Sequence, residues 1–277
     1  MTDAAHSLPP GCDIVPDRAG QRHIVADPVG AEPTFGADIL TKAQLIIARY
    51  PQPRSALLPL LHLVQSVQGY VSQDGIEFCA DQLGLSTAEV SAVATFYTMY
   101  KREPCGEHLV SVCTNTLCAV LGGDEIYAAL RSHLGVGHEE TAGEPGAPGS
   151  ITLEHAECLA ACDLGPVLQV NYEYYDKQTP ESAVELVQAL QRRERPHPTR
   201  GAPLTSFRDV ELQLAGFFEG PGNSLEDTVD GPSAAEETLQ GARLAHERGW
   251  NAPPMPDEAP LPPPPAGHPH PGQEKKQ

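Results

Sequence analysis

The sequence predicts an α+β protein in three parts: a small N-terminal helical bundle, an α/β layer sandwich, and a long proline-rich C-terminal extension. Four segments with helical periodicity come first, the period then changes to that of β-strands, and 15 of the 28 prolines follow Arg195. We therefore expect an extended arm over residues 1–37 and the helical bundle over 38–104. The α/β domain should follow over 105–194, and an extended, partly disordered tail with short docking segments over 195–277.

Composition limits the classes of protein to which the chain can belong. A net charge of −19 argues against nucleic-acid binding, because that binding depends on positive side chains meeting phosphate. The sequence starts without the basic and apolar regions of a secretory signal, and no apolar run is long enough for a membrane span. We therefore expect a cytoplasmic protein that does not insert directly into a membrane.

The bundle is predicted from apolar spacing and from helix-end signals. Glycine and proline without apolar periodicity indicate an extended arm before it. Ser55 is expected to cap the second helix, Gly69 and Gly84 to stop the second and third, and Ser86 with Glu89 to form a capping box for the fourth. Short loops between four helices indicate antiparallel packing. The expected helices cover about 38–50, 55–68, 72–83 and 86–100.

Aromatic residues recur at helical spacing in the fourth predicted helix. Val90, Val93, Tyr97 and Tyr100 share one face, with Phe96 beside them. Core packing is the more frequent role of such a stripe, so we expect a core there rather than a cofactor site. Cys79 in the third helix is expected to be a small buried apolar residue.

The α/β domain is predicted from alternating apolar residues and two amphipathic helices. The helices are expected at about 124–134, with Asp124 as its cap, and at about 180–193, with Pro180 in its first turn. Residues 135–149 are predicted to be a loop. The order β-α-β-β-β-α is typical of an α/β layer sandwich. The expected strands are His108–Val112, Ile151–His155, Val167–Val170 and Glu173–Tyr175.

The tail contains two short segments with near-helical spacing, 207–219 and 233–248. The second begins with Ser233 and Glu236 in the spacing of a capping box. Both segments could pack back on the chain or dock on a partner, and we favour a partner. Residues 252–272 are too rich in proline for a core and are expected to be extended or disordered.

Four of the seven cysteines form two close pairs, Cys113 with Cys118 and Cys158 with Cys162, each after a predicted strand. In a cytoplasmic protein such cysteines indicate a metal or redox site rather than disulfides. Structural zinc also takes four thiolates, but its usual knuckles are tighter C-x2-C turns. A [2Fe–2S] cluster is wider than one ion and needs two loops presented from one edge of a sheet, so the spacing favours the cluster.

With these residues the chain resembles the thioredoxin-like [2Fe–2S] ferredoxin subunits of NADH:quinone oxidoreductase, respiratory complex I. The resemblance rests on the two cysteine pairs, on Gly165–Pro166 after the second pair, and on Val93–Tyr100, and it covers about 38–194. It gives no role for the arm or for the tail, and Cys12, Cys79 and Cys105 have no counterpart in the family pattern. It implies one [2Fe–2S] cluster, with four ligands at Cys113, Cys118, Cys158 and Cys162.

The resemblance also implies a function. Subunits of this family transfer electrons, and the cluster would exchange one electron with the flavin of a partner subunit. The implied partners are the flavin- and NADH-binding subunit and the large iron–sulfur subunit of the same module, peripheral to the inner (plasma) membrane. The sequence has no G-x-G-x-x-G turn and no P-loop, so the isolated chain is not expected to oxidise NADH.

Two alternatives stay open at this point. The first is a diaphorase subunit of a NAD-linked hydrogenase or formate dehydrogenase, which uses a similar module. The second is a zinc-stabilised scaffold or assembly protein.

Two finer expectations concern the site itself. Thr114 and Thr116 could donate hydrogen bonds to sulfur, and acidic surroundings disfavour the addition of an electron, so we expect a low reduction potential. Thioredoxin-like folds often hold a cis proline before the strand that faces the active loop, so we expect a cis bond at Gly165–Pro166.

Overall fold

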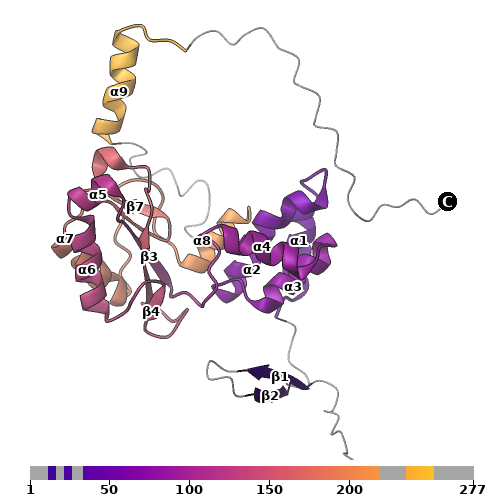
Figure 1. Ribbon diagram of the computed structural model, residues 1–277. Helices are drawn as coiled ribbons and strands as arrows, with labels where there is room; N and C mark the ends of the chain where they lie inside the picture. Colours follow the sequence, from indigo (N-terminus) through magenta and orange to yellow (C-terminus); the bar gives the residue numbers. More distant parts are fainter. Residues whose placement is uncertain (1–11, 17–21, 27–33, 219–234, 253–277) are drawn as a thin grey trace, which may run out of the picture. The chain divides into compact units, whose positions relative to one another are not determined.

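The computed structural model describes residues 12–16, 22–26, 34–218 and 235–252. The chain divides into two compact units, Met1–Ser233 and Ala234–Gln277. The first unit contains the helical bundle and a mixed β-sheet, and the second contains one described helix (Figure 1). No helix among the described residues is both long and apolar enough to cross a membrane.

The expected bundle forms at the start of the first unit, and most of its helix ends follow the predicted signals. Ser86 and Glu89 form the capping box of the fourth helix, and Gly69 and Gly84 end the second and third in a left-handed conformation, as expected. The Ser72 side chain caps the third helix, a cap that was not predicted from the sequence. Cys79 is fully buried in the core, as expected. The helices are α1 (Ala37–Ile47), α2 (Leu57–Gln68), α3 (Gln73–Leu83) and α4 (Thr87–Phe96).

Two expectations about the bundle are wrong. Ser55 lies inside a short 3-10 turn, Pro53–Ala56, and does not cap α2. Helix α4 ends at Phe96 rather than near Tyr100, because Gln65 of α2 bonds to the following backbone: its amide donates to the Met99 carbonyl and its carbonyl accepts from the Lys101 N–H. Buried amide groups of this kind hold the chain in a non-helical path.

The early end of α4 also changes the role of its aromatic residues. Tyr100 is buried and donates its hydroxyl hydrogen bond to the Leu58 carbonyl, as a core residue does. In contrast, Phe96 is 77% exposed and Tyr97 is 45% exposed, so the core prediction is wrong for these two rings.

The second half of the first unit is a five-stranded mixed sheet in the order β4-β5-β3-β6-β7. Strands β3 and β5 are parallel, and the other neighbours are antiparallel. The predicted loop before β5 contains the short edge strand β4, which has no apolar residue longer than alanine to signal it. The strands are β3 (His108–Cys113), β4 (Glu140–Ala142), β5 (Ile151–Ala156), β6 (Leu168–Val170) and β7 (Glu173–Tyr175).

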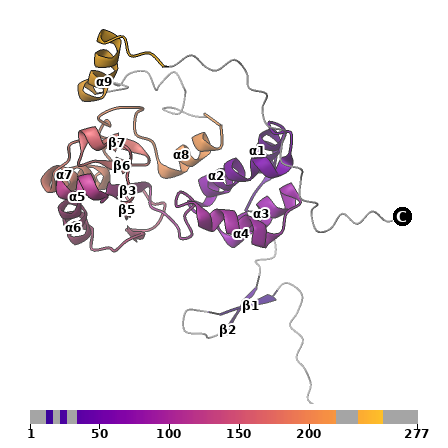
Figure 2. The same cartoon turned by 45° about the horizontal axis from the view of Figure 1, so that its top comes forward.

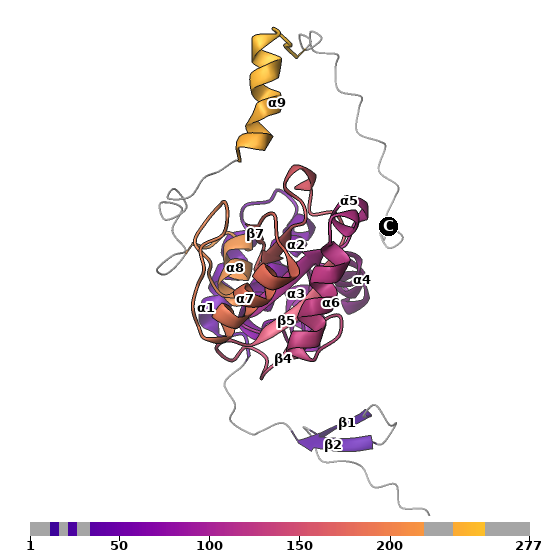
Figure 3. The same cartoon turned by 90° about the vertical axis from the view of Figure 1, so that its left-hand side faces the viewer.

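Three helices accompany the sheet: α5 (Thr116–Val120), α6 (Gly123–Leu134) and α7 (Pro180–Gln191). Helices α6 and α7 lie side by side on one face of the sheet (Figure 3). Val110 and Val112 of β3 belong to the core on this face. The alternate residues of β3 point to the opposite face, where Leu109 packs with Cys105 and Phe207. The sequence missed α5, and Gly122 rather than Asp124 is the N-cap of α6.

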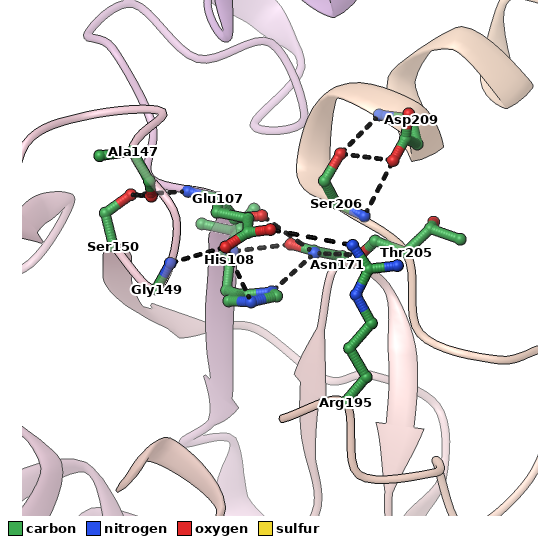
Figure 4. Close-up of polar contacts among 11 residues, drawn as sticks. Glu107, His108, Ala147, Gly149, Ser150, Asn171, Arg195, Thr205, Ser206 and Asp209 are labelled. Atoms are coloured by element: carbon green, nitrogen blue, oxygen red, sulfur yellow. Dashed lines mark hydrogen bonds and ion pairs between the residues drawn. The ribbon is translucent and has the colours of Figure 1, made fainter. Parts of the chain in front are cut away.

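The segment after residue 194 continues to pack on the first unit. Helix α8 (Phe207–Leu214) lies against α2 (Figure 2). The side chain of Phe207 is fully buried. Just before it, the Thr205 carbonyl accepts a 2.7 Å hydrogen bond from the buried Asn171 amide (Figure 4). The near-helical spacing of this segment is confirmed, but the preference for docking on a partner is wrong for α8, which packs back on its own chain, the other outcome left open.

The two ends of the chain depart from their expected form. Within the predicted arm, Cys12–Pro16 (β1) and Arg22–Ala26 (β2) pair as antiparallel strands, consistent with the Ile-Val pair that each contains. In the second unit, α9 (Glu236–Glu247) has Ala235 as its N-cap without a side-chain bond. Ser233, with which the expected capping box begins, lies outside the described residues. The predicted proline-rich segment lies outside the described residues, apart from its first residue.

Candidate metal centre

The first cysteine pair is held at the end of β3. Cys113 is the last residue of the strand and Cys118 lies in α5, and both side chains are only 2% exposed. The Cys113 N–H donates to the Val167 carbonyl, and the Thr114 N–H donates to the Ala156 carbonyl, each at 3.1 Å. The loop is therefore fixed to the strands on both sides of β3.

Two glycines allow other parts of the chain to approach this loop. A Cβ at Gly123 would lie 2.5 Å from the Cys113 carbonyl oxygen and 2.9 Å from the Cys118 carbonyl oxygen. A Cβ at Gly165 would lie 3.4 Å from the Cys118 sulfur. Only a residue without a side chain fits at position 123 without moving the backbone that carries both cysteines.

The second cysteine pair lies on the loop after β5 and is exposed. The sulfurs of Cys158 and Cys162 are 3.5 Å apart. Between them, Leu159 offers its carbonyl to the Tyr174 hydroxyl at 2.7 Å. The Tyr174 ring is covered by the Arg200 guanidinium at 3.9 Å from the ring centre, so residues beyond position 195 help to hold this loop.

The two loops face one another across one cavity. The cavity has a volume of about 230 Å³, and all four cysteines of the two pairs line it. A hydrogen bond of 3.3 Å from the Asn115 amide to the Glu157 carboxylate links the loops directly. The structure therefore brings together the four residues that the sequence predicted, Cys113, Cys118, Cys158 and Cys162.

Two of the four thiols have a raised pKa in this arrangement. Burial raises the pKa of Cys118 to about 11, and the hydrogen bond with Cys158 raises the pKa of Cys162. Metal ligation requires the thiolate, so binding would release these protons. In the described part of the chain, no three His, Cys, Asp or Glu side chains converge on a single point suited to one metal ion. Four thiols around one cavity nevertheless form the donor set that a [2Fe–2S] cluster requires, so the residues fit this group.

The other cysteines lie elsewhere. Cys79 and Cys105 are buried away from the cavity, and burial raises the pKa of each to about 12. The side chain of Cys12 lies outside the described residues. The Thr114 hydroxyl donates to the Ala156 carbonyl at 3.4 Å, and the expected bonds from Thr114 and Thr116 to sulfur stay a prediction.

Several residues that shape the site were not predicted. The Gly122-Gly123 pair was a visible signal for a close approach, whereas nothing in the sequence connects Tyr174 or Arg200 with the cysteine loop. Gly165–Pro166, which follows the second pair, has the expected cis peptide bond.

The mixed sheet, the helices on one face and the four-cysteine cavity are together consistent with a thioredoxin-like ferredoxin. The family model described as thioredoxin-like [2Fe–2S] ferredoxin matches residues 43–191, which is more than half of the chain. The chain belongs to this family, as its sequence motifs indicated.

Named relatives cover most of the chain. A Mycobacterium tuberculosis protein, named as the E subunit of NADH-quinone oxidoreductase, is 52% identical over 241 residues, which are 87% of this chain and 92% of the relative. A Dictyostelium discoideum protein named NADH dehydrogenase [ubiquinone] flavoprotein 2, mitochondrial, is 34% identical over 64% of this chain and 70% of its own length. The solved thioredoxin-like [2Fe–2S] ferredoxin of Aquifex aeolicus is 23% identical over 32% of this chain and 84% of that chain, with a TM-score of 0.26, too low to support an argument.

Proposed function

We propose that this chain is the E subunit of an NADH-quinone oxidoreductase and transfers electrons within that complex through one [2Fe–2S] cluster. The observation that carries the proposal is the four-cysteine cavity in a chain that covers 92% of a relative bearing that name. The same likeness favours the respiratory complex over a hydrogenase or formate dehydrogenase module, and the family favours the cluster over a structural zinc ion.

The proposed ligands are Cys113, Cys118, Cys158 and Cys162. When bound, the cluster supplies a centre that accepts and returns one electron at a time. The first pair is buried at the end of β3 and in α5, while the second pair is exposed on its loop. The link from Asn115 to Glu157 sets the spacing between the two loops.

Partners are proposed from the surface around the cavity. Leu117, Val120 and Leu121 are 45%, 80% and 50% exposed, so among the described residues these apolar side chains next to the buried pair remain open to solvent. Such a surface is typical of a site that another protein chain covers. The proposed neighbours are the flavin- and NADH-binding subunit and the large iron–sulfur subunit, on the cytoplasmic side of the inner membrane.

The proposal is tested by finding which protein must be present for NADH to reduce the cluster. NADH added to the cluster-loaded chain alone should leave the electron paramagnetic resonance spectrum unchanged, because the chain has no nucleotide-binding motif. Addition of the flavin-bearing subunit should then produce the signal of a reduced [2Fe–2S] centre. NADH oxidation by the chain alone, or no reduction in the presence of the flavoprotein, would contradict the proposal.

A further inference from the structure

A polar row crosses the face of the sheet that is turned away from α6 and α7. Ser111 of β3 is in register with Glu154 of β5 on one side and with Gln169 of β6 on the other. The Ser111 hydroxyl donates a 2.5 Å hydrogen bond to the Glu154 carboxylate. Cys113 follows Ser111 by two residues on the same face, a step of about 7 Å along a strand. The row therefore adjoins the first proposed ligand.

Lys101 places a buried positive charge on this row. Its side chain is 6% exposed and its ammonium group bonds to Glu154, whose side chain is 13% exposed. The same nitrogen lies 3.5 Å from the more exposed Glu139 carboxylate. Burial by itself would lower the pKa of Lys101, but the attraction of the two glutamates outweighs it and the pKa is raised. Lys101 is therefore protonated at neutral pH.

The ion pair and the second cysteine loop share a cavity. The residues that line this cavity of about 420 Å³ include Lys101, Glu154, Cys158 and Leu159. Among the described residues that line this cavity or the four-cysteine cavity, Lys101 is the sole lysine or arginine, whereas Glu139, Glu154 and Glu157 are acidic. Two histidines, His138 and His155, complete the titratable groups of the larger cavity apart from Cys158 and Tyr172.

The role inferred here for Lys101 rests on the proposed function, because it requires a cluster at the four cysteines. We propose that Lys101 raises the reduction potential of the cluster, and that Glu154 positions its ammonium group and opposes its effect. Reduction adds a negative charge, which a nearby cation stabilises and a nearby carboxylate destabilises. The low exposure of both side chains limits screening by solvent and salt, so each charge should act on the centre with its own sign.

The test is a redox titration of the cluster-loaded full chain, followed by electron paramagnetic resonance at one pH above the usual range of glutamate. Lys101→Met should lower the ratio of reduced to oxidised cluster at a fixed ambient potential by about tenfold, the order expected for one partly screened charge. For a one-electron couple this is about 59 mV. Glu154→Gln should shift the ratio in the opposite direction, and the double variant should fall between the two single variants. Lys101→Arg, which keeps the charge, should stay near the unaltered chain.

Opposite shifts separate an electrostatic role from a structural one, because a loosened fold would move both single variants the same way. Arg54→Met is the matched control: it removes the cation of the exposed Arg54–Glu89 pair in the bundle and should leave the potential unchanged. Shifts of the same sign, or unshifted potentials in both Lys101→Met and Glu154→Gln, would overturn the inference. If Lys101→Met does not fold, the Glu154→Gln variant alone tests the inference: a higher potential supports it, and a lower or unchanged potential overturns it.

Iron and sulfide analysis distinguishes a failure of the role of Lys101 from a failure of the proposed function. If the unaltered chain binds no iron and sulfide, the proposed function fails. If the variants retain full iron and sulfide but their potentials do not move, only the role of Lys101 fails.

Discussion

Replacement of Asn171 by glycine tests how the segment before α8 is held on the sheet. Asn171 lies in the two-residue turn between β6 and β7, and it is fully buried. Its carbonyl oxygen accepts from the Leu109 N–H at 2.7 Å. Its amide donates to the Thr205 carbonyl at 2.7 Å and to the Glu107 carbonyl at 3.2 Å (Figure 4). One side chain therefore joins β3 to the chain that leads into α8.

The expected loss in the free energy of unfolding follows from the buried groups that lose a hydrogen-bond partner. Asn171→Gly leaves the Leu109 N–H and the Thr205 carbonyl without this partner, at about 1–3 kcal/mol for each buried group. We therefore expect a loss of roughly 2–6 kcal/mol in the free energy of unfolding. The backbone φ of Asn171 is +49°, a conformation that glycine adopts without strain. Asn171→Ala should cost about 1 kcal/mol more, because its Cβ disfavours that conformation.

Urea denaturation of the three proteins, with the cluster in the same state, gives the comparison by linear extrapolation. The expected order of stability is the unaltered chain, then Asn171→Gly, then Asn171→Ala. If Asn171→Gly unfolds at the same urea concentration as the unaltered chain, the hydrogen bonds of this side chain do not hold the segment. If the alanine variant matches the glycine variant, the argument from the left-handed backbone is wrong.

Three further predictions concern the site, its potential and the bundle. Gly123→Ala should lower iron and sulfide content per chain, because its Cβ would lie 2.5 Å from the Cys113 carbonyl oxygen; Gly241→Ala, with no atom within 4 Å, should leave that content unchanged. A redox titration should show a low reduction potential, and ready reduction near the potential of a quinone pool would contradict the effect assigned to the acidic surroundings. The backbone hydrogen bond from Ser86 and the contact with Arg54 lower the pKa of Glu89 from its ordinary 4.5 to about 2. The stabilising effect of the Glu89 carboxylate should therefore be complete above pH 4.5 and be lost as the pH falls toward 2. Glu89→Gln should reduce the change in urea midpoint between pH 4.5 and pH 2. An unchanged pH profile in this variant would refute the role assigned to Glu89.

The features that the sequence predicted best are those set by neighbouring residues. The capping box of Ser86 and Glu89 forms within four residues, and each cysteine pair spans only a few residues at the end of one strand. The predicted [2Fe–2S] cluster required two loops presented from one edge of the sheet. The parallel pairing of β3 and β5 provides this arrangement.

The features that the sequence missed depend on distant residues. Helix α4 stops at Phe96 because of the Gln65 amide, which belongs to another helix. Helix α8 packs on α2 through a contact that no local pattern reveals, and its buried Glu211 accepts from the Tyr172 hydroxyl at 3.2 Å and pairs with His62. A buried carboxylate with partners from two other elements is invisible to periodicity, because only the folded chain brings those partners together.

Iron and acid-labile sulfide analysis of the purified chain and its Cys158→Ala variant tests the central claim most directly. The proposed [2Fe–2S] centre predicts a brown protein with iron and sulfide in equal amounts, and a loss of both in Cys158→Ala. Cys105→Ala, which removes a cysteine outside the four-cysteine cavity, should retain them. A colourless protein that contains zinc, or unchanged iron and sulfide in Cys158→Ala, would contradict a four-thiolate electron carrier at this site.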